Sequence, residues 1–393
     1  MNPEIFRWAR ETSGWTVEQA SKALSCAVDT LRSVEQGDTQ PSRPLLLKMV
    51  KQYRRPLITF YLNEPPKRAS RGEDFRTLPT GPISAEEPLL DALLRDVQSR
   101  QDLVRDTLLG EDEDYRLSFI GSMDITVGVA TMVERIVSIF GMSRQEFRAQ
   151  RTSDKAFTYL RSKVEANGVF VLLVGNLGSH TTNLSVDTFR GYTIADHVAP
   201  FIVINDQDAK TAWSFTLMHE LAHLILGASG VSSINGDRAI EKFCNDVAAA
   251  FLLEEGEIHE LGISMETDTN SAVQMISDFA GRNHLSRRMV SYSLYRAGIV
   301  SREFWRAIEA VLSKKRVTER EKDPEAGGPT YYILRRHRLG PALLDFARHS
   351  VETGALSPTK ASIVLGVKPI NVYPLLFEVK PGKKSKRVGG VGR

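Results

Sequence analysis

The feature that most limits how this chain can fold is residues 211–226, an apolar stretch that carries His219, Glu220 and His223. Its apolar residues recur every three or four positions, which predicts a buried helix that begins near Lys210. Residues four apart lie on one face of a helix, with Cβ atoms roughly 5–6 Å apart, so both imidazoles can reach one metal ion. The segment therefore predicts a metal site on a helix that other parts of the chain enclose.

Glu220 lies beside the two histidines, where its carboxylate can take a proton from an attacking water molecule instead of binding the metal. The sequence His-Glu-x-x-His on a helix is typical of zinc metallopeptidases. Catalytic zinc usually has three protein ligands, so a third ligand is required. The alternative is that His219 and His223 are ordinary hydrogen-bonded residues of a buried helix.

The third ligand must come from another segment, and residues 237–253 predict a second helix that packs against the first. Glu241 lies at the edge of the apolar face of this helix, which makes it the best-placed carboxylate. Asp246, Asp237 and Glu255 are the competing candidates. The alternative for Glu241 is an exposed carboxylate in the first turn, where the helix dipole favours a negative charge.

The two motif segments, residues 219–223 and 241–253, resemble the ImmA/IrrE family of metallopeptidases, also called the M78 peptidases. This resemblance implies Zn²⁺ as the cofactor, Glu241 as the third ligand and Asn245 as a supporting polar residue. Three positions depart from the family pattern: Cys244 replaces an alanine, Val247 a phenylalanine and Glu254 a proline.

Short apolar runs before the motif helix predict a small sheet. Residues 168–175 and 201–205 are bounded by glycines or polar turns, which favours buried strands. Residues 189–194 are a candidate edge strand that could hold an extended peptide by main-chain pairing. A strand, a turn and the motif helix follow one another in the order that a zincin-like fold needs.

A second resemblance covers residues 2–66, which are similar to the helix-turn-helix domain of Xre-type regulators. Apolar residues at helical spacing can close a small all-helical core there, and Gly37 is a natural end for the helix that finishes near Glu35.

The second helix of a helix-turn-helix enters the major groove of DNA with its N-terminal residues. Here Thr30, Arg32 and Ser33 are the candidates for DNA contact, whereas Asp29 would repel the phosphates. The alternative is a small helical module that binds protein, because a fold does not by itself carry a function.

The order of these segments predicts a multidomain, mainly α chain with a small α+β zincin-like catalytic domain and an N-terminal all-α helix-turn-helix domain. Between them, helices are expected over residues 89–109, 127–140 and 144–163. The predicted divisions are 1–66 (helix-turn-helix domain), 67–88 (linker), 89–165 (helical region), 166–316 (zincin-like metallopeptidase domain), 317–329 (linker), 330–378 (C-terminal helical module) and 379–393 (basic disordered tail).

Composition agrees with a folded chain, since 42% of the 393 residues are hydrophobic and 25% are charged, which excludes a disordered protein. A net charge of +3 is too small to imply nucleic-acid binding by the whole chain, although the basic tail could bind phosphates or simply be solvated. No apolar run is long enough to span a membrane and no signal sequence is evident, so we expect a cytoplasmic protein without a membrane partner. Cys26 and Cys244 are expected to be buried thiols, and His284 a solvent-facing loop residue.

Together these features predict a zinc-dependent endopeptidase, regulatory in role, that cleaves a partner protein such as a helix-turn-helix repressor or an antitoxin. Two alternatives stay open. The chain could be a DNA-binding transcriptional regulator whose peptidase fold only binds a partner. It could also be the regulatory half of a toxin-antitoxin or phage-derived pair, in which binding matters more than cleavage.

Overall fold

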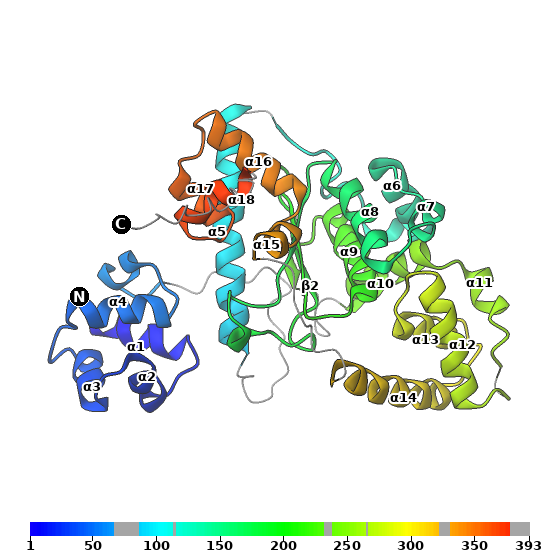
Figure 1. Ribbon diagram of the computed structural model, residues 1–393, viewed down its shortest axis with the longest axis horizontal. Coiled ribbons are helices and arrows are strands. Elements are labelled where there is room, and N and C mark those ends of the chain that lie inside the picture. Colours follow the sequence, from blue (N-terminus) through cyan, green and yellow to red (C-terminus); the bar gives the residue numbers. More distant parts are fainter. Residues whose placement is uncertain (67–85, 113–114, 232–237, 265, 322–330, 378–393) are drawn as a thin grey trace, which may run out of the picture.

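The computed structural model describes residues 1–66, 86–112, 115–231, 238–264, 266–321 and 331–377. The described residues are mainly helical with one small sheet, which confirms the predicted fold class (Figure 1). Most of the two predicted linkers and all of the basic tail lie outside these residues. Among the helices that are described, none is long and apolar enough to cross a membrane.

The N-terminal helices form a unit with its own core. This unit consists of α1 (Pro3–Glu11), α2 (Val17–Leu24), α3 (Val28–Gln36), α4 (Arg43–Gln52) and the 3-10 helix η1 (Leu57–Tyr61). Their apolar faces meet around Phe6, Leu31 and Phe60, which are almost fully buried. Arg10 on α1 forms a buried ion pair with Glu35 on α3 at 2.7 Å, which holds the first helix across the third.

A four-stranded sheet lies at the centre of the remaining chain, in the order β1-β3-β2-β4. Its strands are β1 (Phe170–Leu173), β2 (Gly191–Ile194), β3 (Phe201–Ile204) and β4 (Gly230–Val231). β1 runs parallel to β3, and β2 runs antiparallel to both of its neighbours. β2 is therefore an inner strand, and the prediction that residues 189–194 form an edge is wrong because β4 pairs with their outer side.

Helices cover both faces of this sheet, which explains why β1 and β3 are apolar at every position. Successive side chains of a strand point to opposite faces. Val171 and Leu173 accordingly belong to the core with α8 (Ser153–Glu165) and α9 (Lys210–Leu226), while Phe170 and Leu172 belong to a second core.

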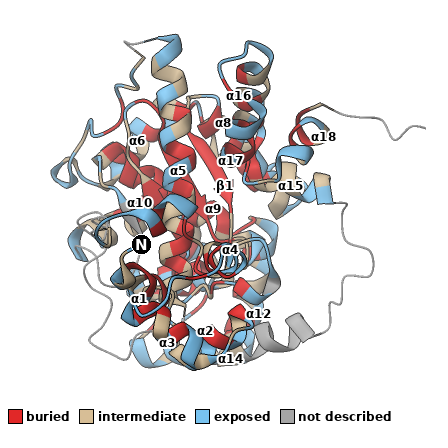
Figure 2. Ribbon diagram, turned by 90° about the vertical axis from the view of Figure 1, so that its left-hand side faces the viewer, coloured by how far each residue is buried: buried red, intermediate tan, exposed pale blue. Residues whose placement is uncertain are grey.

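The second core joins two parts of the chain that are far apart in sequence. Helix α5 (Glu87–Glu111) packs there with the C-terminal helices, which lie around it in Figure 1. These are α15 (Tyr331–Leu339), α16 (Pro341–Glu352), α17 (Pro358–Val364), the 3-10 helix η5 (Pro369–Asn371) and α18 (Val372–Leu376). The C-terminal module is thus packed against the sheet that also supports α9 (Figure 2).

The first core contains the other helices. These are α6 (Val129–Phe140), α7 (Arg144–Arg148), α10 (Arg238–Leu252), α11 (Glu255–Glu260), α12 (Thr269–Arg282), α13 (Arg287–Arg296) and α14 (Arg302–Glu321), with the 3-10 turn η3 (Ile125–Val127). The 3-10 turn η4 (His180–Thr182) lies between Leu177 and Leu184, which belong to the second core. The single helix predicted over residues 144–163 is in fact α7 and α8, because Thr152 leaves the helical conformation and its side chain caps the start of α8.

Arg161 on α8 forms a buried ion pair within its helix and also connects the sheet to the C-terminal helices. Arg161 on α8 is 4% exposed and donates from Nε to Glu165 at 2.9 Å. Its other nitrogens donate to the carbonyl oxygens of Val171 on β1 and His337 on α15. Because Gly340 lies against the same guanidinium with a positive φ of 80°, a larger residue there would overlap Arg161.

Candidate metal centre

Helix α9 is apolar nearly all round, which places its whole middle in the core. His219, Glu220 and His223 are 5%, 0% and 4% exposed. The helix ends at Gly227, which adopts the left-handed conformation and lies against Gly121. Three polar side chains in such a place require polar partners, because an unpaired buried polar group is costly.

Helix α10 supplies the partner for both histidines. Glu241 in its first turn lies with Oε2 3.4 Å from Nε2 of His219 and Oε1 3.4 Å from Nε2 of His223. The two Nε2 atoms are 3.1 Å apart. A ligand atom from each of the three residues lies within 4.8 Å of the others. The packing of α9 on α10 thus brings together three residues that are separated by up to 22 positions in sequence.

These separations fit one tetrahedral metal ion. Ligands bound at about 2.0–2.1 Å to a tetrahedral zinc ion lie roughly 3.3 Å from one another. The two Nε2 atoms are 3.1 Å apart, and each lies 3.4 Å from a different oxygen of the Glu241 carboxylate, so one ion between the three side chains is within reach of all of them. Two imidazole nitrogens and a carboxylate oxygen also match the ligand types of catalytic zinc. The residues present could therefore hold Zn²⁺ and leave a fourth position open.

When no metal is bound, the charges in the cluster favour an ion pair between the Glu241 carboxylate and the protonated His223. Burial opposes ionisation of Glu241, but hydrogen bonds from His219 and His223 hold the pKa of this carboxyl at about 2. Burial lowers the pKa of His223, yet its hydrogen bonds to Cys244 and Glu241 outweigh burial and raise that pKa well above its usual value. A metal ion would take the place of the proton that His223 holds.

Glu220 faces the sheet side of α9 and is held there by β2. The hydroxyl of Thr193 lies 2.8 Å from Oε2 of Glu220 and 3.1 Å from its backbone carbonyl oxygen. A Cβ at Gly191 would lie 2.5 Å from Oε1 of Glu220 and 2.7 Å from Cγ2 of Thr216. The carboxylate therefore occupies space that the absence of a side chain at Gly191 provides.

Sequence reasoning missed three residues of this site. Thr193 and Gly191 contact Glu220 only because β2 crosses α9, and no local pattern marks them. Cys244 is fully buried and hydrogen-bonds His223. Cys244 follows Glu241 by one turn on the face of α10 that is predicted to pack on the motif helix. This position is the local signal that indicates a contact with the histidines.

Of the competing ligand candidates, Asp246 is the one whose side chain is described, and it does not join the cluster. Asp246 forms ion pairs with Arg296 at 3.1 Å and Lys242 at 3.9 Å. Asp237 lies outside the described residues, as does the side chain of Glu255. Asn245 is half-buried on α10.

Two other expectations need correction. His284 is 7% exposed and its Nε2 lies 2.6 Å from the carbonyl oxygen of Gln150, so it is a buried residue and not a solvent-facing one. The chain turns back at His284 with a φ of 58°, which directs the ring inward against Phe147. Both cysteines are free; Cys244 is buried, but Cys26 is only half-buried.

In the N-terminal unit, the residues expected to contact DNA lie at the start of α3. Thr30 and Arg32 are exposed and Ser33 is half-buried. Arg32 forms ion pairs with Glu18 at 3.3 Å and Asp29 at 3.9 Å. Because these pairs are exposed, they are weak and can exchange for a phosphate.

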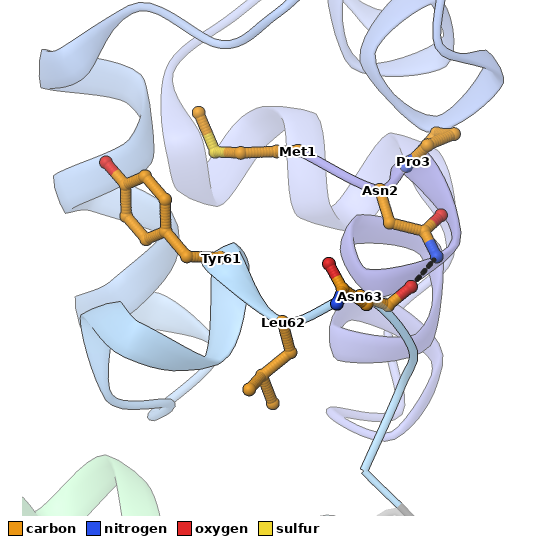
Figure 3. Close-up of a pocket in the computed structure, with 6 residues that line it drawn as sticks. All are labelled: Met1, Asn2, Pro3, Tyr61, Leu62 and Asn63. Atoms are coloured by element: carbon orange, nitrogen blue, oxygen red, sulfur yellow. Dashed lines mark hydrogen bonds between the residues drawn. The ribbon is translucent and has the colours of Figure 1, made fainter.

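A shallow depression on the same unit lies between the N-terminus and the end of η1 (Figure 3). Two of its lining residues are joined by a hydrogen bond from Asn2 Nδ2 to the carbonyl oxygen of Asn63 at 2.7 Å. The residues that line it are Met1, Asn2, Pro3, Tyr61, Leu62 and Asn63. None of these is a His, Cys, Asp or Glu, so the depression offers no metal site.

Comparison with known families agrees with both resemblances. Residues 176–293 match the IrrE N-terminal-like domain of the M78 peptidases, and residues 5–57 match a helix-turn-helix domain. The first match contains β2, β3, α9 and α10, and the second contains most of α1 and all of α2, α3 and α4. No curated protein and no solved structure matches the chain. The chain thus combines an M78 peptidase-like domain with a helix-turn-helix domain. This combination is consistent with a family of regulatory proteins.

Proposed function

We propose that the chain is a zinc-dependent endopeptidase with a regulatory role, whose substrate is a partner protein such as a helix-turn-helix repressor or an antitoxin. His219, His223 and Glu241 would be the ligands of Zn²⁺, and Glu220 the general base. The observation that carries this proposal is that the two imidazole Nε2 atoms lie 3.1 Å apart and that each lies 3.4 Å from one oxygen of the Glu241 carboxylate.

Zinc in such a site polarises the scissile carbonyl and makes water a better nucleophile near neutral pH. The chain's own residues supply the other functions. Glu220 takes the proton of the attacking water and returns it to the leaving amine. Thr193 and the small Gly191 keep the Glu220 carboxylate in one position, and Glu241 neutralises positive charge beside the histidines.

Metal content of the purified protein is the first test, compared with the His223→Ala and Glu241→Gln variants. We expect about one zinc per chain in the wild-type protein and little in either variant. His259→Ala, an exposed histidine on α11, is the matched control and should retain zinc. No metal in the wild-type protein, even after incubation with zinc, would refute a zinc centre.

Glu220→Gln separates metal binding from catalysis. The variant should keep zinc, because Glu220 is not a ligand, but should lose cleavage of an unfolded test protein and of candidate repressors. Cleavage at the wild-type rate by Glu220→Gln would remove Glu220 as the base.

DNA binding by the N-terminal unit is a second candidate function, favoured by the helix-turn-helix match over residues 5–57. We propose that Thr30, Arg32 and Ser33 contact DNA from the start of α3. Affinity for a duplex should fall steeply as salt rises, because phosphate contacts release counterions. Arg32→Gln should weaken binding, whereas Arg135→Gln on α6 should not; equal affinity of both variants and wild type would contradict this interface.

A further inference from the structure

Two arginines lie together in the second core, on the face of the sheet opposite to α9. Arg100 on α5 is 5% exposed, and Arg335 on α15 reaches the same place from the C-terminal module. A Cβ at Gly366 would overlap the guanidinium of Arg100 and lie 2.5 Å from Nη2 of Arg335. Both guanidinium groups therefore touch the same glycine and lie beside one another.

The hydrogen bonds formed by these arginines leave several donors without a partner. Nη2 of Arg100 donates to Asp96 at 2.5 Å, and Nη2 of Arg335 donates to the carbonyl oxygens of Leu365 and Gly366 at 2.7 Å each. Buried Nε and Nη1 of Arg100 and buried Nε of Arg335 have no partner. Since buried N–H groups are nearly always paired, these donors require an acceptor.

Tyr192 on β2 adds a further donor to this group. It is 2% exposed, and its hydroxyl has no hydrogen-bond partner. Tyr192 belongs to the same core as the α5 and α15 side chains, and its hydroxyl lies within electrostatic range of Arg100 and Asp96. Donors from three separate elements, α5, α15 and β2, are thus unsatisfied in one region.

The charge in this region is also unbalanced. Among the described residues, Asp96 is the carboxylate that acts on both guanidinium groups, and its side chain is 42% exposed and so is screened by water. Burial and the neighbouring charge of Arg100 lower the pKa of Arg335 to about 10. A buried cation without a counter-charge is costly, so this arrangement favours an anion with several acceptor oxygens.

We propose that Arg100, Arg335 and Tyr192 bind one oxyanion group, a phosphate or a carboxylate, between α5, α15 and β2. Arginine suits this ligand because its planar donors match the oxygens of both groups. The carbonyl oxygens of Leu365 and Gly366 hold Arg335 in place through Nη2 and leave its Nε free for the ligand. This site is distinct from the cluster on α9 and does not depend on the proposed peptidase activity.

Thermal unfolding of the full chain measures this binding directly. Inorganic phosphate is titrated against malonate at constant ionic strength, with sodium chloride as the balancing salt. We expect the unfolding midpoint to rise and saturate with one or both anions, because a ligand that binds the folded state stabilises it. The anion with the lower dissociation constant identifies the group that the site prefers.

Variants locate the effect. Tyr192→Phe removes one hydroxyl and should raise the dissociation constant about tenfold without disturbing the fold. Arg335→Gln should abolish the saturable rise. Arg135→Gln, an exposed arginine on α6, is the control and should behave like the wild type. The series is repeated in His223→Ala protein, which lacks the imidazole whose positive charge could attract an anion to the histidine cluster.

Two results would overturn the proposal. A midpoint that follows ionic strength alone, with no saturation, would show that no specific anion site exists. An equal rise in wild type, Tyr192→Phe and Arg335→Gln would indicate an adventitious ion only, bound elsewhere on the chain.

Discussion

The hydroxyl of Thr193 on β2 lies 2.8 Å from the Glu220 carboxylate on α9. Both residues are almost fully buried, so this hydrogen bond acts in a region of low dielectric. It joins the sheet to the helix at the residue proposed as the general base.

Replacing Thr193 by valine should impair cleavage more than metal binding. A hydrogen bond to a charged group contributes about 1.5–3 kcal/mol, so kcat/KM should fall about tenfold to a hundredfold. Zinc affinity should stay within about twofold, since Thr193 contacts no ligand. Thr158→Val, at an exposed position on α8, is the control. Unchanged kcat/KM in Thr193→Val would show that the hydroxyl does not position Glu220.

Gly191→Ala should displace Glu220. The new Cβ would lie 2.5 Å from the carboxylate oxygen Oε1, which is closer than any real contact allows. Overpacking of this kind costs about 1–3 kcal/mol of folding free energy, measured by urea unfolding. Activity should fall at least tenfold while zinc content stays near one per chain. Gly281→Ala on α12 meets no atom within 4 Å and should change neither property.

Zinc affinity should depend on pH in one direction. The raised pKa of His223 means that the metal-free protein holds a proton there at neutral pH, and this proton must leave when zinc binds. Affinity should therefore strengthen up to about tenfold per pH unit as pH rises, until His223 is neutral without metal. Glu241, with a pKa of about 2, stays ionised throughout and adds no slope. Competition with a chelating dye between pH 6 and pH 8, about the range where histidine titrates, measures this slope. A flat profile would show that His223 is already neutral.

The Arg161–Glu165 pair should matter for stability only when it is broken on one side. Arg161→Met leaves the buried carboxylate of Glu165 unpaired, which should cost about 3–5 kcal/mol in urea unfolding. The double variant Arg161→Met/Glu165→Leu removes both charges and should recover part of that loss. If the double variant is less stable than the single one by the full cost of a second lesion, the two residues are not coupled.

The two motif helices could be predicted because the apolar spacing that indicates a helix lies within each segment itself. The apolar spacing of residues 211–226 and 237–253 predicts both helices, and the structure has α9 at Lys210–Leu226 and α10 at Arg238–Leu252. The place of Glu241 on the helix face makes it the preferred carboxylate, and the structure puts its two oxygens 3.4 Å from Nε2 of His219 and of His223. Its role as a ligand stays a prediction until metal is measured.

The features that could not be predicted from the sequence depend on contacts between segments that are far apart in the chain. β2 was predicted as an edge strand because nothing local indicates that residues 230–231 pair with it. The contact of Thr193 with Glu220 follows from the same strand order. The anion site combines residues from α5, β2 and α15, which are brought together only by the second core. The domain divisions likewise stay predictions.

The second core also has a consequence for how the protein is made. Helix α5 leaves the ribosome more than 200 residues before α15 to α18, the helices that cover it. Until those helices are synthesised, the apolar face of α5 and one face of the sheet have no permanent cover, and exposed apolar surface of this kind promotes aggregation. A chain that stops after α14 should therefore need a chaperone or precipitate, even though the residues of the metal cluster have all been made.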